Sequence, residues 1–387
     1  MSSFPDRCSD AEFERRRRVV REEMQIEGVD CLLCYGTNQG WANIFYLTNH
    51  RDQISCYLIL QAQDEATLFT GVFPHLEIAK RDSVVRDVHF GGAQAVSLVV
   101  KELVRKQLKK AVIGLVEPGS FRYPGIPHRD MEFFRKELPG VTFIPATYLV
   151  ENIRRRKSDE EIELLRAAAT LTDKAFSAVV DSVRPGVTEL DLARVAAGSV
   201  GDTMALLIGS TPMSNPTVPY PSYHPCSRQL RQGDVVLLEF SLGIAGYAGQ
   251  ILGTVTLGPP TEHYEKLYRL AVKSYENICA TLREGCSPKD VVEAGRSITE
   301  AGLTTGDPLV HGYGLGMEDG LHVGPEDHPA YWPPGKFSFP VRASVSVEPN
   351  PCTPDMKSGV VTGDLVIIWE DGVEKLHKVP RHDIIIV

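Results

Sequence analysis

The sequence predicts an α+β protein of two domains, an N-terminal α/β domain followed by a C-terminal domain that contains an internal repeat. At 387 residues the chain is too long for one ordinary hydrophobic core. Strand-like and helix-like segments alternate up to about residue 150, and two similar helix–turn–helix segments lie about a hundred residues apart beyond it. We therefore place the domains at residues 1–153 and 154–387.

The composition is typical of a globular enzyme with a small-molecule substrate. A net charge of −9 provides no positive field for nucleic acid phosphates. No apolar run approaches the roughly 20 residues that a membrane span needs, and the first residues lack the pattern of a secretory signal. Eight scattered cysteines favour a reducing compartment. We therefore expect a cytoplasmic protein that binds neither nucleic acid nor membrane.

The N-terminal domain begins with a predicted helix over residues 9–27, which a capping-box pattern at Ser9 opens. The arginine run within it, residues 15–18, is interpreted as a solvated helix face. Cys31 and Cys34 lie in a predicted buried strand, where their side chains point to opposite faces, so we expect no redox or metal site there. The strands are predicted over residues 31–35, 56–60, 66–69, 112–115 and 141–143, with a helix over residues 93–108.

The internal repeat consists of residues 183–192 and 282–291. Each segment follows a long helix, turns at a glycine and caps a new helix with Thr188 or Ser287. An aspartate stands three residues after each cap, where the carboxylate of a capping box belongs. This pattern indicates a duplicated half-domain rather than a solenoid.

Strands with tight turns and two long loops fill the rest of the C-terminal domain. Loops of this length inside a compact domain usually line or cover a site. The strands are predicted over residues 234–240, 246–257, 343–348, 364–369 and 375–379, and the proline-rich loops over residues 210–228 and 323–340.

Six motifs in order resemble the creatinase–prolidase–methionine aminopeptidase family. The resemblance covers nearly the whole chain and implies a creatinase-like N-terminal domain and a C-terminal pita-bread domain with a pseudo-two-fold repeat. The motifs are the Arg-x-x-Lys-Ser-x-x-Glu-Ile linker at residues 154–162, Gly233-Asp234, Gly246-Tyr247, His311-Gly312-Tyr313-Gly314-Leu315-Gly316, Val347-Glu348-Pro349 and the closing hairpin at residues 370–376.

The resemblance also identifies five positions at which metal-dependent members carry two Asp, one His and two Glu. Those side chains hold two divalent ions that activate a water. In this sequence the positions are Glu239, Gln250, His311, Glu348 and Gly363. Gln250 offers a neutral amide and Gly363 offers no side chain, so two carboxylates would face two ions. We therefore expect no dinuclear metal site and no cofactor, and a single metal on Glu239, His311 and Glu348 is the alternative that these residues leave open.

The remaining groups resemble those of the metal-independent members creatinase and ectoine hydrolase. His224 stands nine residues before Gly233 (233 − 224), close to the place of creatinase's acid–base histidine. The resemblance therefore implies that His224 transfers protons, while Glu239, His311 and Glu348 bind and polarise the substrate.

Four further residues are predicted to bind the substrate. Arg51 corresponds to an arginine that creatinase borrows from its partner subunit, which implies a homodimer. Gln250 and Tyr313 are expected to line the pocket. His322 corresponds to a second family histidine, but it lies 11 residues after His311 (322 − 311), which indicates an insertion around residues 317–320.

The leading hypothesis is a metal-independent hydrolase of a C–N bond in a small polar, nitrogen-containing metabolite. One alternative is a scaffold reassigned to a lyase, isomerase or cyclase step in secondary metabolism. Another is a catalytically inactive binding module. An Xaa-Pro peptidase ranks last on the sequence, because Gln250 and Gly363 replace metal ligands.

Overall fold

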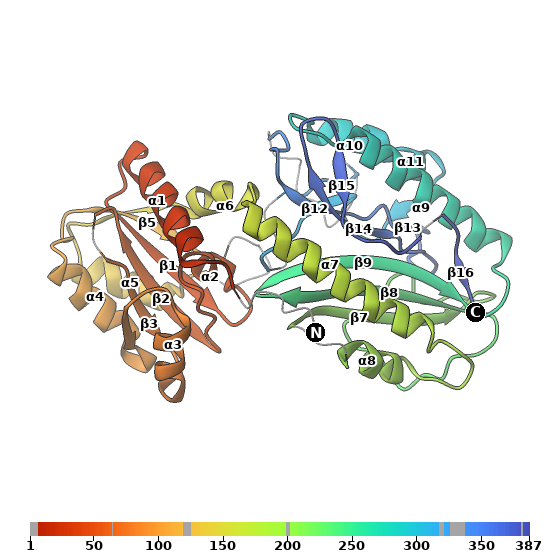
Figure 1. Cartoon of the computed structure of the whole chain (residues 1–387), viewed down its shortest axis with the longest axis horizontal. Coiled ribbons are helices and arrows are strands. Elements are labelled where there is room, and N and C mark those ends of the chain that lie inside the picture. Colours follow the sequence, from red (N-terminus) through yellow and green to blue (C-terminus); the bar gives the residue numbers. More distant parts are fainter. Residues whose placement is uncertain are drawn as a thin grey trace. The chain divides into compact units, whose positions relative to one another are not determined.

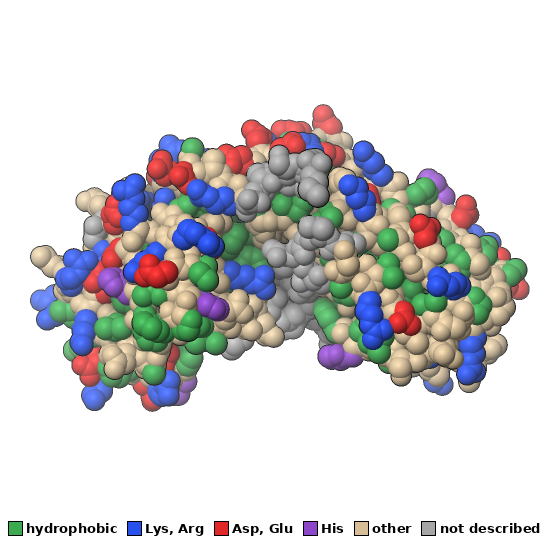
Figure 2. Space-filling model, turned by 60° about the horizontal axis from the view of Figure 1, so that its bottom comes forward, with side chains coloured by type: hydrophobic (Ala, Val, Ile, Leu, Met, Phe, Trp, Pro, Cys, Tyr) green, Lys and Arg blue, Asp and Glu red, His purple; other side chains and the backbone are tan. Residues whose placement is uncertain are grey.

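The computed structural model describes residues 7–63, 65–118, 125–198, 202–316, 321–325, 337–380 and 382–387. It divides into two compact units, residues 7–154 and residues 155–387 (Figure 1). None of the helices in the described ranges has the length and apolar character that a membrane crossing requires. On the face that Figure 2 shows, acidic and basic side chains are interspersed rather than gathered into one field.

The N-terminal unit contains a six-stranded sheet in the order β4-β3-β2-β1-β5-β6, with helices packed on it. The central strand β1 runs antiparallel to β2 and parallel to β5. The predicted mixture of strands and helices is therefore confirmed. The elements are α1 (Asp10–Ile26), β1 (Cys31–Thr37), α2 (Ala42–Thr48), β2 (Ser55–Gln61), β3 (Thr67–Thr70), η1 (Phe73–His75), α3 (Leu76–Asp82), β4 (Asp87–Phe90), η2 (Gly92–Gln94), α4 (Ala95–Arg105), β5 (Val112–Val116), α5 (His128–Glu137), β6 (Thr142–Pro145) and α6 (Thr147–Arg155).

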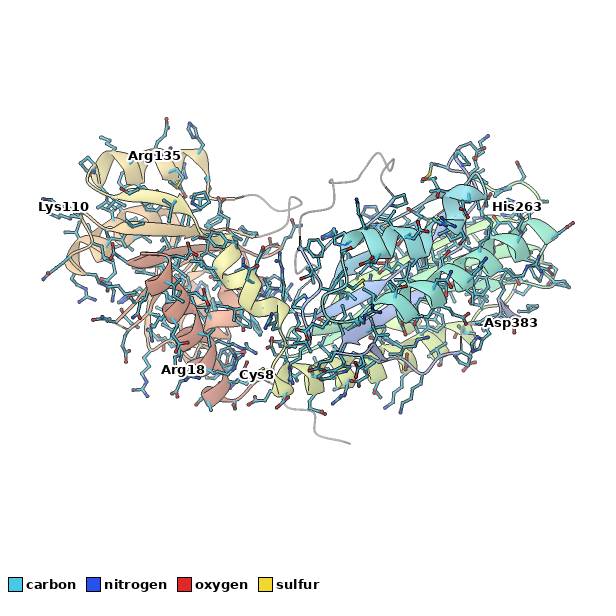
Figure 3. All side chains as sticks on the ribbon, turned by 90° about the horizontal axis from the view of Figure 1, so that it is seen from above. Cys8, Arg18, Lys110, Arg135, His263 and Asp383 are labelled. Carbon is cyan, nitrogen blue, oxygen red and sulfur yellow. The ribbon has the colours of Figure 1, made fainter. Side chains whose placement is uncertain are left out.

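Helix α1 begins at its predicted cap, but its arginine run is not uniformly solvated. The Ser9 hydroxyl accepts a hydrogen bond from the backbone of Glu12. Arg16 is fully buried, with its guanidinium 2.8 Å from Glu12 and 4.3 Å from the Tyr46 ring centre. Arg18 projects into solvent instead (Figure 3). The expectation was wrong for Arg16 because it lies on the same side of the helix as the buried Val20, four residues later.

Cys31 and Cys34 lie in β1 and are both fully buried. Burial raises the pKa of the Cys31 thiol to about 12 and also raises that of Cys34. Because the thiolate is the reactive form of cysteine, neither side chain is suited to redox chemistry or metal binding at neutral pH.

The C-terminal unit contains an eight-stranded sheet, whose main path follows the order β11-β12-β14-β9-β8-β7. Strand β15 pairs with β14, and β16 pairs with β9. A separate two-stranded sheet joins β10 to β13. The strands are β7 (Asp202–Pro212), β8 (Asp234–Ile244), β9 (Tyr247–Thr256), β10 (Thr304–Thr305), β11 (Val310–Gly312), β12 (Ser344–Val347), β13 (Pro351–Cys352), β14 (Gly363–Ile368), β15 (Val373–Lys375) and β16 (Ile385–Ile386).

The predicted repeat appears as two helix pairs, α7 with α8 and α9 with α10. In both second helices the capping box forms, between Thr188 and Asp191 in α8 and between Ser287 and Asp290 in α10. The duplication is therefore confirmed in structure. The helices are α7 (Asp159–Val180), α8 (Glu189–Ala197), α9 (Glu262–Thr281), α10 (Pro288–Gly295) and α11 (Ser297–Glu300).

The two helix pairs cover one set of alternating side chains on the strands. Leu238 and Phe240 of β8 pack with the apolar side chains of α7 and α8. Val345 and Val347 of β12 pack with those of α9 and α10. Because successive strand residues point to opposite faces, Glu239 lies on the face of β8 opposite to Leu238 and Phe240. Val235 and Leu237 share that face with Glu239 and pack with α9.

Gly363 marks a close approach between β14 and β12. A Cβ atom at this position would lie 2.1 Å from the carbonyl oxygen of Val347 and 3.1 Å from the Cα of Glu348. A separation of 2.1 Å from a backbone oxygen does not occur for real Cβ atoms, so no side chain fits here unless the backbone moves.

We expect Gly363→Ala to destabilise the protein by about 1–3 kcal/mol, the usual cost of overpacking a filled interior. Chemical denaturation measures this loss. Gly372→Ala is the matched control, because a Cβ there meets nothing within 4 Å. If Gly363→Ala is as stable as Gly372→Ala, the strands separate easily and the close approach does not constrain this position.

Candidate functional site

The positions that the resemblance singled out lie in adjacent strands of the C-terminal sheet. His311 is in β11, Glu348 follows β12, Gly363 begins β14, Gln250 is in β9 and Glu239 is in β8. These strands are neighbours in the order β11-β12-β14-β9-β8. The sheet therefore gathers residues that are up to 124 positions apart in the sequence (363 − 239).

Glu239 and Gln250 meet through the register of β8 and β9. Glu239 pairs with Leu252, and Ser241 pairs with Gln250, so Glu239 and Gln250 are diagonal neighbours on one face. The Gln250 Nε2 donates to Glu239 Oε1 at 2.9 Å. Gln250 thus acts as a hydrogen-bond donor where the resemblance would place an anionic metal ligand.

The carboxyl group of Glu239 is buried and held at both oxygens. The second oxygen, Oε2, accepts a hydrogen bond from the Tyr220 hydroxyl at 2.8 Å. Burial raises the pKa of Glu239 to about 8, and the negative charges of Glu348 and Asp307 act in the same direction, against the hydrogen bonds from Tyr220 and Gln250. Glu239 is therefore mostly protonated at neutral pH.

His311 and Glu348 form a second pair. The Nε2 of His311 lies 2.9 Å from Glu348 Oε1, and its Nδ1 lies 3.2 Å from the Gly312 carbonyl oxygen. A carbonyl oxygen only accepts, and so does an ionised carboxylate. Both contacts are satisfied only when the pair carries one proton more than a neutral imidazole and a carboxylate. The pair is thus arranged to hold a mobile proton.

Two of the predicted substrate-binding residues lie beside His311. The His322 ring is stacked on the His311 ring with 5.9 Å between centres, and the Tyr313 ring meets it edge-on at 5.5 Å. The insertion expected at residues 317–320 lies outside the described residues, as do residues 326–336 of the second long loop. His311, Tyr313 and His322 therefore form one cluster of rings.

Two buried oxygens near these pairs lack hydrogen-bond partners among the described residues. They are Gln250 Oε1 and Glu348 Oε2. Leaving a buried acceptor unpaired costs about 1–3 kcal/mol, more for a charged one, so such atoms usually face a water or a ligand. Both atoms are acceptors, which suits a ligand with N–H groups.

The remaining predicted site residues are not part of this cluster of contacts. His224 is exposed on the loop after β7, where its backbone N–H binds the Ser222 hydroxyl, and its imidazole pairs with none of the described side chains. Arg51 belongs to the N-terminal unit, where its guanidinium lies 4.6 Å from the centre of the Trp41 ring. Their proposed roles in proton transfer and substrate binding stay predictions.

Sequence reasoning missed two residues that the structure brings to Glu239. Tyr220 reaches it from the proline-rich loop that was expected to line a site, so the loop was found but the residue was not. Asp307 lies four positions before His311 (311 − 307) and contributes a negative charge near both Tyr220 and Glu239. No motif marks either residue.

A dinuclear metal centre does not fit these side chains. Gln250 contributes no charge and Gly363 no side chain, so of the five positions only Glu239 and Glu348 offer a carboxylate to two ions. Within the described ranges, no three His, Cys, Asp or Glu side chains are grouped so that they could hold a metal ion.

Comparison with known proteins identifies relatives over nearly the whole length. An Xaa-Pro dipeptidase of Pyrococcus furiosus is 23% identical, with 88% of this chain and 92% of that protein covered. An uncharacterized hydrolase/peptidase of Sinorhizobium fredii is 26% identical, over 80% and 81% of the two chains. The crystal structure of an X-Pro aminopeptidase from Thermotoga maritima superposes with a TM-score of 0.81 at 20% identity, covering 97% and 99%, and shows the shared fold.

Two family models divide the chain between them. The creatinase/prolidase N-terminal domain matches residues 16–156, and metallopeptidase family M24 matches residues 163–370. The second match alone spans more than half of the chain. The chain therefore belongs to metallopeptidase family M24, the creatinase–prolidase family of pita-bread hydrolases.

Proposed function

We propose that this chain is a hydrolase that cleaves a C–N bond in a small polar, nitrogen-containing substrate, using side-chain acids and bases instead of two metal ions. The observation that carries the proposal is the state of Glu239. Its carboxyl group is buried beside Gln250, a neutral amide that donates to it at the position where two metal ions would need a second carboxylate. The raised pKa of Glu239 supports a role as an acid.

Two neighbouring buried carboxyl groups supply the acid and the base in this proposal. Glu239 is protonated at neutral pH, while the negative charge on Glu348 helps to keep it so. Such a pair is a common way to place an acid and a base in one site. We assign Glu239 as the acid that protonates the leaving nitrogen, and Glu348 as the base that takes a proton from the attacking water.

The protons of this reaction balance without a further reactant. Water attacks the carbon of the C–N bond and passes one proton to Glu348, while Glu239 gives its proton to the nitrogen that leaves. Glu348 is then protonated and Glu239 ionised. Proton exchange with solvent restores both groups, with the His311 pair as a neighbouring proton store.

The charges of the site favour a substrate with several N–H donors. Glu348 and Asp307 are negative, and the unpaired Gln250 Oε1 is a further acceptor. Charge-assisted hydrogen bonds from an amidinium, guanidinium or ammonium group would satisfy these atoms. This supports a nitrogen-rich metabolite over a neutral or anionic one.

His224 remains an alternative source of the proton. Its exposed position without a side-chain partner makes Glu239 the better-supported acid, but a loop residue can move when a substrate binds. A His224→Ala variant separates the two assignments, because it should retain activity if Glu239 is the acid.

The second candidate function is Xaa-Pro peptidase activity. The sequence ranked it last, but the names of relatives such as the Pyrococcus furiosus Xaa-Pro dipeptidase favour it. The family's peptidase chemistry depends on metal ions, and the replaced side chains at positions 250 and 363 speak against it here. Metal dependence therefore distinguishes the two candidates.

We expect turnover to survive removal of metal ions. The purified protein would be treated with a chelator and assayed against a panel of amidines, guanidines, cyclic amides and Xaa-Pro dipeptides, with products identified by mass spectrometry. Activity on a nitrogen-rich compound that is equal with and without chelator supports the proposal. Activity that disappears with chelator and returns with Mn²⁺ or Fe²⁺ would contradict it, and Xaa-Pro cleavage would favour the second candidate.

The rate should fall as the pH rises above about 8, because ionised Glu239 can no longer donate a proton. Glu239→Gln should lower kcat by roughly 10²–10⁴-fold, the usual contribution of an acid–base group, and remove this pH limb. Glu262→Gln, at an exposed position in α9, is the control. A Glu239→Gln variant with the wild-type pH profile would exclude Glu239 as the acid.

The same carboxyl group should make stability depend on pH. Its pKa is about 8 in the folded protein against an ordinary 4.5, so between these pH values the folded state keeps a proton that the unfolded chain has lost. The free energy of unfolding should therefore decrease from pH 5 to pH 8 in the wild type relative to Glu239→Gln. Urea unfolding at several pH values measures the difference, and parallel curves for the two proteins would show that Glu239 ionises normally.

A further inference from the structure

Residues 219–221, which we call the strap, lie against three glycines from separate parts of the C-terminal unit. A Cβ on Gly359 would be 2.3 Å from the Pro219 carbonyl oxygen. A Cβ on Gly306 would be 2.7 Å from Cδ2 of the Tyr220 ring, and one on Gly209 would be 3.1 Å from the Tyr220 carbonyl oxygen. The strap thus occupies space that three missing side chains provide.

The backbone conformation does not explain these glycines. None of the three has a positive φ, so alanine could adopt the same backbone angles. The close approach of the strap excludes a side chain at Gly306 and, together with the Cβ of Cys352 at 3.0 Å, at Gly359. Gly306 follows β10 and Gly359 follows β13. The surface against which the strap lies therefore forms only when this unit is folded.

Hydrogen bonds hold the chain on both sides of the strap. Before it, the Thr217 N–H donates to the Thr211 hydroxyl at 2.9 Å. After it, Ser222 and Ile208 exchange two backbone hydrogen bonds of 3.0 and 3.2 Å. Proline at 219 and 221 fixes φ at both positions, which reduces the conformations available to Tyr220 between them. The strap is therefore held in one position rather than poised as a lid.

This position determines where the Tyr220 hydroxyl lies. The ring rests on Gly306, and the hydroxyl reaches Glu239 Oε2 at 2.8 Å, with Asp307 as its second carboxyl neighbour. Gln250 holds the other oxygen of Glu239. Two donors from different elements therefore define the plane of one carboxyl group.

We propose that the strap is a fixed part of the site and that Tyr220 is a positioning residue, which orients the carboxyl group of Glu239 toward the substrate. The assignment rests on the proposed function, in which Glu239 is the acid. It adds that the orientation of this acid is set from outside the sheet, by a loop whose place depends on Gly306 and Gly359.

Two variants test the proposal by different routes. Tyr220→Phe removes the hydroxyl and keeps the ring. Gly359→Ala leaves Tyr220 intact and displaces the strap, since its methyl group would meet the Pro219 carbonyl. Both should lower kcat, by up to about 100-fold for a displacement near 1 Å, with little change in KM. The controls are Gly372→Ala and Tyr264→Phe, which removes a buried hydroxyl in α9 that pairs with none of the described residues.

A second readout does not depend on turnover. The 13 tyrosines would be replaced by 3-fluorotyrosine, and the fluorine signal of Tyr220 identified by its absence from Tyr220→Phe. This signal should shift in Glu239→Gln and in Gly359→Ala, because the hydroxyl loses or changes its partner. It should stay in place in Gly372→Ala. A Tyr220 signal that moves in neither Glu239→Gln nor Gly359→Ala would overturn the placement.

The outcomes separate the inference from the proposed function. Wild-type kcat in Tyr220→Phe would overturn the positioning role, whatever the fate of Gly359→Ala. If Gly359→Ala fails to fold, Tyr220→Phe and the fluorine shift in Glu239→Gln still decide. If the wild-type protein turns over nothing in the panel, the proposed function fails, and the fluorine shifts alone decide whether the strap holds Tyr220 against Glu239.

Discussion

Gln250 and Tyr220 each donate a hydrogen bond to the buried carboxyl group of Glu239, and the chemistry of the site depends on this contact. The two hydrogen bonds favour the ionised carboxylate, but burial favours the protonated acid more strongly, so the pKa of Glu239 is raised. The nearby charge of Glu348 reinforces that state.

The helix pair α7–α8 packs on the face of β8 opposite to Glu239. Leu238 and Phe240 of β8 pack with α7 and α8, whereas Val235 and Leu237, on the same face as Glu239, pack with α9. Gly363 then brings β14 so near to β12 that no carboxylate can stand between them.

Several features were predictable because they depend on residues near one another in the chain. The caps at Ser9, Thr188 and Ser287 form as their spacing indicated. Arg16 and Tyr220 were not predictable in this way. Arg16 is buried by contacts with Tyr46, 30 residues away, and Tyr220 meets Glu239 only because three distant glycines leave room for its loop.

By itself, the sequence determined the family resemblance, the duplicated helix pairs and which residue types stand at the five former ligand positions. These are matters of local spacing and residue identity, which a chain carries before it folds. Only the tertiary structure decided that Tyr220 holds Glu239, that His311 pairs with Glu348 and that His224 stands apart from both. The register of the strands and the position of the loop that carries Tyr220 set those contacts. Both arise from packing between segments far apart in the chain.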